Sequence, residues 1–129
     1  MTRTQPWLES FPWETIVAQN AVLCRAKGAL HRPTSEGYEK TRDLWVQTHG
    51  RSMTLDEAVF LCCQCHRQAP FCFYNGNTFA SVIALVIKRL DWDPIQAHVV
   101  RSLACHIVAG VSSAEEEESF RRYCESMSG

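Results

Sequence analysis

The feature that most constrains this chain is a long apolar segment that directly follows a polar turn. Asn75-Gly76-Asn77 is typical of a turn, and residues Thr78 to Leu90 then place apolar side chains on nearly every face of a helix. A helix that is apolar all round has to be covered by other elements. The sequence therefore predicts that the segment from Thr78 to Leu90 is the central helix of a bundle.

Start and stop signals predict further helices on both sides of this segment. Thr54 with Glu57 and Ser113 with Glu116 form capping boxes, and Asp93-Pro94 combines an N-cap with a first-turn proline. We expect an all-α fold, a single bundle of about six helices around one buried central helix, in one domain spanning residues 1–129. No segment favours a strand. The other expected helices run from Pro12 to Gly28, Thr34 to Gly50, Thr54 to Pro70, Asp93 to Gly110 and Ser113 to Met127.

Charge and composition exclude several classes of partner. The chain has 13 basic and 14 acidic residues and no basic stripe, which disfavours nucleic acid as a partner. The N-terminus lacks an apolar signal segment, and the run from Val82 to Ile87 is too short to span a membrane. The seven cysteines, an odd number, fall at helical positions, which is typical of reduced thiols. We therefore expect a cytoplasmic protein without a membrane or nucleic-acid partner.

One cluster of cysteines invites a metal interpretation. Cys62, Cys65 and His66 share one face of the expected helix, but a structural zinc site commonly uses four ligands from two elements. Cys105 and His106 are adjacent and diverge on a helix. We therefore expect a Cys-rich core face and no bound metal. A Cys nucleophile with a His base would need a spatial pairing that sequence does not reveal; the histidines available are His31, His49, His66, His98 and His106.

The segment from Asn75 to Thr78 has two interpretations. It can be an ordinary turn, with Asn77 or Thr78 as the N-cap of the following helix. It can also be an anion-binding loop, because the first turn of a helix has free N–H groups and the positive end of the helix dipole. Residues alone do not decide between the two.

In this region the chain resembles the Fic/Doc superfamily, and in particular the short Doc-type toxins. The family motif is H-x-F-x-[DE]-[GA]-N-[GK]-R, followed by a buried central helix, and Phe73, Gly76 and Asn77 occupy three of its positions. The basic pair Lys88-Arg89 at the end of the central helix, and the segments 109–113 and 120–123, are similar to Doc-like chains as well. The resemblance covers about residues 54 to 127 and implies an all-helical fold.

The motif departs from the family at the positions that carry its chemistry. Phe71 replaces the His that acts as general base, Asn75 replaces the acidic Mg²⁺ ligand, and Phe79 replaces the Arg that binds phosphates. Thr78 stands at the [GK] position before it and does not match that position. A phenyl ring accepts no proton, and a neutral amide is a weaker ligand for a hard cation. The resemblance thus implies a degenerate motif loop, made of Phe71, Phe73, Asn75, Gly76, Asn77, Thr78 and Phe79, with no catalytic residue and no required cofactor.

We expect a Doc-like domain that acts through contact with a protein, either an antitoxin-like partner or a target. Trp7, Phe11 and Trp13 are candidate anchors for such a contact, or else they cover the core. One alternative is an active phosphoryl- or nucleotidyl-transferase that uses ATP and Mg²⁺, with His66 as the alternative base. A further alternative is an unrelated helical domain that contains metal or thiols.

Overall fold

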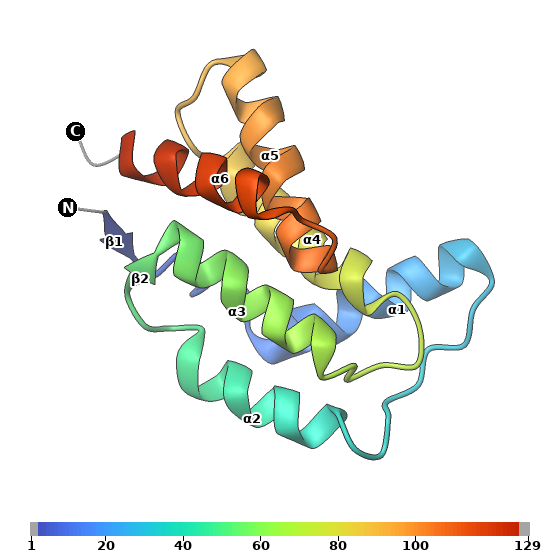
Figure 1. The fold of residues 1–129 in the computed structure, drawn as a ribbon. Coiled ribbons are helices and arrows are strands. Elements are labelled where there is room, and N and C mark those ends of the chain that lie inside the picture. The colour runs from blue at the N-terminus through green and yellow to red at the C-terminus, as the bar shows by residue number, and fades with distance from the viewer. Residues whose placement is uncertain (1–2, 127–129) are drawn as a thin grey trace.

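The computed structural model describes residues 3–126, and the described chain is helical apart from loops and two very short strands (Figure 1). This confirms the expected all-α bundle. The strands β1 (Thr4–Gln5) and β2 (Met53–Thr54) pair antiparallel, with Thr4 opposite Thr54. A strand of two residues is too short to show the alternation of apolar and polar residues by which a strand is predicted from sequence. The helices are α1 (Trp13–Lys27), α2 (Tyr38–Thr48), α3 (Leu55–Arg67), α4 (Asn75–Lys88), α5 (Pro94–Ala109) and α6 (Ala114–Ser126).

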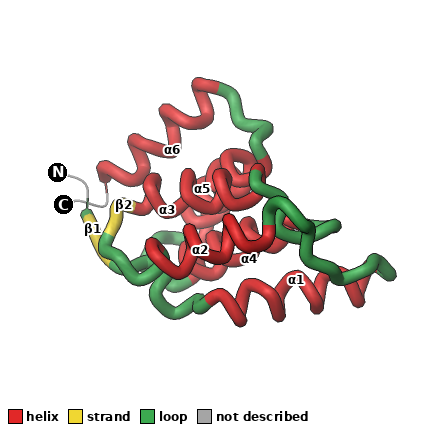
Figure 2. Tube along the Cα trace, turned by 90° about the horizontal axis from the view of Figure 1, so that it is seen from below, coloured by secondary structure: helices red, strands yellow, loops and turns green. Residues whose placement is uncertain are grey.

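The helices pack in an order that places α4 among several neighbours. Helices α3, α4 and α5 contact one another, α6 packs on α5 and α3, and α1 packs on α4 and α2. Figure 2 shows the same arrangement from below, with a long loop between α1 and α2. Because α4 is in contact with α1, α3 and α5, its first turn lies where several elements meet.

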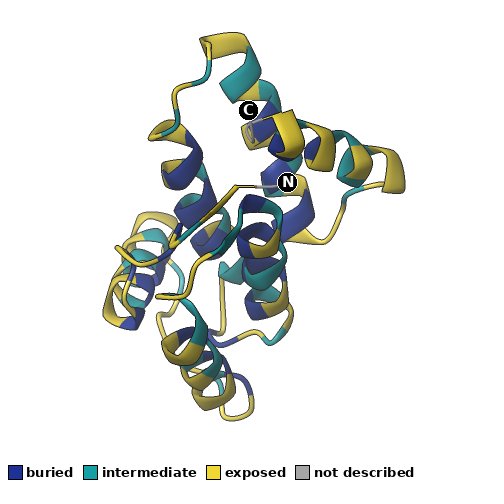
Figure 3. Cartoon of the chain, turned by 90° about the vertical axis from the view of Figure 1, so that its left-hand side faces the viewer, coloured by how far each residue is buried: buried dark blue, intermediate teal, exposed yellow. Residues whose placement is uncertain are grey.

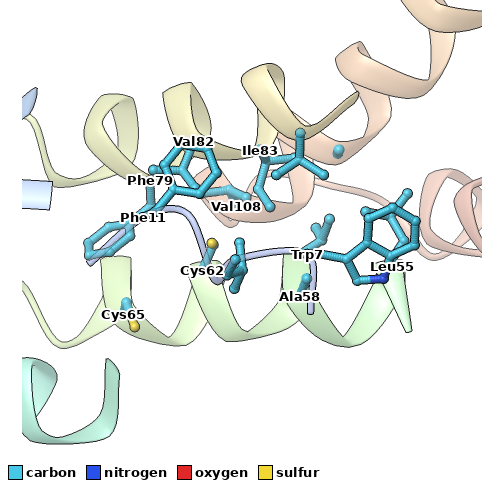
Figure 4. Close-up of a cluster of buried hydrophobic side chains, with 14 of the residues drawn as sticks. Trp7, Phe11, Leu55, Ala58, Cys62, Cys65, Phe79, Val82, Ile83 and Val108 are labelled. Atoms are coloured by element: carbon cyan, nitrogen blue, oxygen red, sulfur yellow. The ribbon is translucent and has the colours of Figure 1, made fainter. Parts of the chain in front are cut away.

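The core lies between α3 and α4 and is closed by the N-terminal segment. Figure 4 shows Phe79, Val82 and Ile83 of α4 directed toward Ala58 and Cys62 of α3. Residues that face inward are buried on every helix (Figure 3). One helix face alone buries too little apolar surface, so the stability of each helix depends on this shared cluster.

The N-terminal aromatic residues belong to this core and are not surface anchors. Trp7, Phe11 and Trp13 are only 8%, 4% and 5% exposed. The indole Nε1 of Trp45 donates a hydrogen bond to the Phe11 carbonyl oxygen at 2.8 Å. Of the two interpretations of these aromatics, the one in which they cover the core is correct.

Most of the expected helix ends are confirmed. Thr54 and Glu57 form the capping box of α3, Ser113 and Glu116 exchange the same two bonds at α6, and the Asp93 carboxylate accepts from the Gln96 N–H at 2.9 Å. Gly28 and Gly110 end α1 and α5 in the left-handed conformation, with φ of 66° and 76°. These signals are local, which is why sequence reveals them.

Three expected boundaries are wrong or lie outside the described chain. Helix α4 begins at Asn75, not at Thr78, and Tyr74 is its N-cap. Helix α2 begins at Tyr38, and Thr34 instead accepts the Gly37 N–H with its hydroxyl oxygen at 3.2 Å. Met127 lies outside the described residues.

The central helix is buried on one broad face and not on all of them. Leu85, which the sequence places on an apolar face, is 44% exposed, whereas Val86 beside it is 4% exposed. The prediction that α4 is covered all round is therefore wrong for the side that carries Leu85. Within residues 3–126, no helix is long and apolar enough to cross a membrane.

Candidate functional site

The first part of the motif loop lies between α3 and α4, and its later residues form the first turns of α4. The part before α4 is tied to the loop that joins α1 to α2. The Thr34 N–H donates to the Pro70 carbonyl at 2.9 Å, and the Cys72 N–H donates to the Arg32 carbonyl at 3.0 Å. Pro33 and Phe71 face each other as an antiparallel bridge. The segment from Arg32 to Thr34, which is far from the motif loop in sequence, thus holds the motif loop in one conformation.

Phe71 fills an aromatic cage. Its ring stacks on Trp13 with centroids 5.9 Å apart and an interplanar angle of 10°, and meets Tyr38 edge-on at 6.0 Å. His31 lies at 5.8 Å, and Phe71 is only 1% exposed. Phe71 is therefore part of the core.

The Asn75 side chain closes the motif loop. Its Oδ1 accepts from the Phe71 N–H at 2.9 Å, and its Nδ2 donates to the Phe71 carbonyl at 2.7 Å. Both ends of the amide are thus used within the loop. Asn75 is in no position to serve as a ligand for a cation without breaking this pair of bonds.

A buried polar network, which the sequence reasoning missed, supports the same loop from α1. Asn20 is fully buried, and its Nδ2 donates to the Phe73 carbonyl at 2.8 Å and to the Thr78 hydroxyl at 3.0 Å. Its Oδ1 is 2.8 Å from His31 Nδ1. Asn20 lies midway between Ile16 and Cys24 on the apolar stripe of α1, and a polar residue at such a position was the available signal.

Phe79 and Thr78 are buried structural residues. Phe79 has no exposed surface, and its ring packs on Trp45 with centroids 5.8 Å apart. The Thr78 hydroxyl donates to the Tyr74 carbonyl at 2.7 Å. Phe79 therefore points into the core and not over the loop.

Two aromatic side chains remain at the surface of the loop. Phe73 is 49% exposed, although it holds the conserved aromatic position of the motif, and its ring centroid is 6.4 Å from that of Tyr74. Tyr74 has φ of 60° and ψ of 34°, a left-handed conformation that costs free energy for an aromatic residue. Such strain persists only where the surroundings fix the backbone, as the bonds described above do.

A shallow pocket of about 540 Å³ opens beside Tyr74 at the first turn of α4. Within the described chain, the N–H groups of Asn75, Gly76 and Asn77 make no hydrogen bond, and the first helical bond is made by the Thr78 N–H. The pocket is lined by His66, Tyr74, Asn75, Gly76, Asn77, Ala80, Cys105 and Ala109. Of the predicted motif residues, the structure thus brings Asn75, Gly76 and Asn77 together with His66.

His66 stands over this first turn in a fixed orientation. Its Nδ1 is 2.8 Å from the Val108 carbonyl oxygen, so Nδ1 donates and Nε2 carries the lone pair of the neutral ring. A Cβ at position 76 would lie 3.2 Å from His66 Cε1 and 3.4 Å from Nε2. The imidazole therefore contacts Gly76, and the absence of a side chain there leaves room for the ring.

The thiols near and behind this pocket differ in their environment. Burial raises the pKa of the Cys105 thiol, and the neighbouring Arg101 guanidinium acts in the opposite direction. Burial also raises the pKa of Cys62 well above its ordinary value and that of Cys65 to about 12. Among residues 3–126, no three His, Cys, Asp or Glu side chains are grouped so that they could hold a metal ion.

Comparisons with protein-family models, with curated proteins and with solved structures find no match to this chain. The resemblance to Fic/Doc proteins accordingly rests on the motif positions Phe73, Gly76 and Asn77 and on the helix that follows them.

Proposed function

We propose that this chain is a Doc-like domain with a degenerate motif that acts by contact with a partner protein. The observation that supports the proposal is the use of the three key motif positions as structural residues. Phe71 fills an aromatic cage, the Asn75 amide is bonded to Phe71 at both ends, and Phe79 is fully buried. A loop equipped in this way lacks the base, the Mg²⁺ ligand and the arginine of the Fic/Doc motif.

The motif loop itself supplies the contact surface in this proposal. Phe73 and Tyr74 are presented on a backbone that is fixed by Asn20 and by the bridge at Phe71. Large aromatic side chains contribute most of the binding energy in many interfaces, and little ordering entropy is lost when their backbone is already fixed. An antitoxin-like segment or a target protein would bind over Phe73.

A binding experiment tests this proposal. Purified wild type captures its partner from the source cell extract, and Phe73→Ser is expected to weaken that capture at least about fivefold, because truncating an interface anchor costs more than about 1 kcal/mol. Val46→Ser is the matched control, since Val46 is 58% exposed on α2 and away from the loop. Equal capture by Phe73→Ser and wild type would contradict the proposal.

The position of His66 favours a second candidate, transfer of a phosphoryl or nucleotidyl group from ATP to a protein hydroxyl. The His66 ring lies against Gly76 in the first turn of α4, where a base and an anion site would be needed. The residues present do not fit Mg²⁺, because among the described residues no carboxylate lines the pocket and the Asn75 amide is already bonded.

Calorimetry with ATP and Mg²⁺ separates the two candidates. The first predicts weak binding or none, and no labelling of protein by labelled ATP. Micromolar binding, with labelling that His66→Ala abolishes, would establish the second candidate and overturn the first.

A further inference from the structure

The two segments that build the surface around the motif loop contain no carboxylate side chain. Residues 15–35 form most of α1 and the loop after it, and residues 58–90 form most of α3, the motif loop and α4. None of the 14 acidic residues of the chain lies in these segments. The basic residues in them are Arg25, Lys27, Arg32, Arg67, Lys88 and Arg89. Because the whole chain has nearly equal numbers of the two charges, these segments concentrate its positive charge.

Two of these basic side chains lie on the motif-loop side and have no ion-pair partner. The Cys72 N–H donates to the Arg32 carbonyl at 3.0 Å, which places Arg32 next to the residue before Phe73. Lys27 follows Asn20 by two turns on the same face of α1, and Asn20 Nδ2 donates to the Phe73 carbonyl at 2.8 Å. The side chains of Lys27 and Arg32 are exposed, and within the described chain neither makes a hydrogen bond or an ion pair.

No carboxylate of the chain balances this charge at Phe73. The next acidic residue after the loop is Glu36, and its neighbour Gly37 packs against the Ala69 carbonyl, at the other end of the paired segment. Among the described residues, no carboxylate lines the pocket beside Tyr74. The exposed Phe73 ring is thus bordered by positive charge, and the counter-charge has to come from another molecule.

We propose that the protein segment that binds over Phe73 is acidic, with an apolar side chain on the Phe73 ring and carboxylates that pair with Lys27 and Arg32. This inference rests on the proposed function, because it concerns the partner of the same surface, and it adds the charge of that partner. Complementary charges around an interface speed association and exclude wrong partners. A nucleic acid is disfavoured as the occupant, since two basic side chains neutralise few phosphates and the chain has no basic stripe.

The test selects peptides from a displayed library of random sequences on the full chain and measures their affinity by fluorescence anisotropy. The selected peptides are expected to carry more Asp and Glu than the unselected library. The double variant Lys27→Gln/Arg32→Gln should bind the best peptide about threefold or more weakly at low salt, because each exposed ion pair changes an affinity by a factor of about 1.5–5. Added salt should reduce this difference.

The matched control is the double variant Arg51→Gln/Lys88→Gln, which removes the same charge elsewhere. Arg51 lies between α2 and β2, Lys88 is at the far end of α4, and both are exposed. This variant should bind the best peptide as the wild type does.

The outcomes separate this inference from the proposed function. Acidic peptides that Lys27→Gln/Arg32→Gln weakens, and that the control does not, support the inference. Peptides without an excess of carboxylates that Phe73→Ser weakens overturn the inference and leave the proposed function in place. A selection that enriches no peptide overturns the inference, and so do acidic peptides that both double variants bind as the wild type does. Tighter binding of a single-stranded oligonucleotide or of phosphatidylserine vesicles than of the best peptide also overturns it, since the partner would then belong to another class.

Discussion

The Asn75 amide binds the backbone of Phe71 at both ends, accepting from its N–H at 2.9 Å and donating to its carbonyl at 2.7 Å. A carboxylate of the same size accepts the first bond and is unable to donate the second. The structure therefore accounts for an amide at this position by the geometry of the loop, with no reference to metal binding. Phe71 can enter its aromatic cage because this pair of bonds turns the chain back toward α4.

Asn75→Asp is the first prediction. At neutral pH the Asp carboxylate would face the Phe71 carbonyl oxygen, so the variant is expected to lose about 1–3 kcal/mol of unfolding free energy despite the favourable helix start. A protonated Asp donates and accepts as Asn does. The folded state thus raises the pKa of this carboxyl, and the stability deficit should shrink as pH falls from about 7 to about 4.

Denaturant melts at several pH values measure this effect. Asn77→Asp is the control, since Asn77 is exposed in the same helical turn and its side chain makes no hydrogen bond within the described chain. If Asn75→Asp is as stable as wild type at neutral pH, the two-bond closure of the loop is not a significant source of stability.

Most of the helix ends could be predicted from local sequence signals. The features that were predicted wrongly depend on contacts between segments that are distant in sequence. Thr54 and Ser113 cap helices with groups three residues away, so their sequence spacing is sufficient. The start of α4 was misplaced because Tyr74 adopts a left-handed conformation in a segment that distant residues hold, Asn20 at the Phe73 carbonyl and Arg32 at the Cys72 N–H. Local preference places the turn at Asn-Gly, and tertiary contacts override it.

The candidate site was only partly predictable for the same reason. Sequence put Asn75, Gly76 and Asn77 in a turn before a helix and named His66 as a possible base, and all four residues line one pocket. Cys105 is distant in sequence, and nothing local indicates that α5 lines the same pocket. The burial of Phe79 against Trp45 likewise depends on how α2 packs, which no pattern within α4 encodes.

The buried face of α4 gives the second prediction. Val86→Asp would bury an unpaired charge at a position that is 4% exposed, and it should cost about 3–5 kcal/mol of unfolding free energy. Leu85→Asp is a matched control one residue away, at 44% exposure, and should cost less than about 1 kcal/mol. Thermal melts followed by circular dichroism measure both, and equal effects would mean that the exposed side of α4 is wrongly assigned.

The contact between Gly76 and His66 gives the third prediction. Replacing glycine by alanine inside a helix usually gains about 0.5–1 kcal/mol. Here the new Cβ would lie 3.2 Å from His66 Cε1 and push the ring from its bond to the Val108 carbonyl. Gly76→Ala is therefore expected to lose about 1 kcal/mol in the wild type and to regain stability in a His66→Ala background.

A double-mutant cycle on denaturant melts gives the coupling between the two positions. Asn77→Ala in the same two backgrounds is the control, since the residue is exposed and one step further along α4. An absence of coupling between Gly76 and His66 would mean that the imidazole does not contact the first turn of α4.

The cap of α6 gives the fourth prediction, which concerns pH. Hydrogen bonds from His106 and from the Ser113 backbone hold the pKa of Glu116 below its ordinary value of 4.5. A lowered folded-state pKa contributes stability that is present above the unfolded value and is lost as pH falls through the folded value. Glu116→Gln should therefore flatten the acid limb of the stability profile below pH 4.5, whereas Glu115→Gln, whose side chain makes no hydrogen bond in the described chain, should not.

The fifth prediction concerns the seven cysteines. A thiol reagent added to the native protein should modify Cys72 fast, because it alone is exposed among these cysteines, and Cys105 more slowly. The remaining thiols should react only on unfolding, since they are buried and burial raises the pKa of Cys65 and of Cys124 to about 12.

Elemental analysis of protein purified without added metal should find no zinc. Stoichiometric zinc, together with protection of Cys62 and Cys65 that a chelator removes, would instead identify these two residues and His66 as metal ligands. A metal site here is disfavoured by the helical spacing of the three residues and by the hydrogen bond between His66 and the Val108 carbonyl.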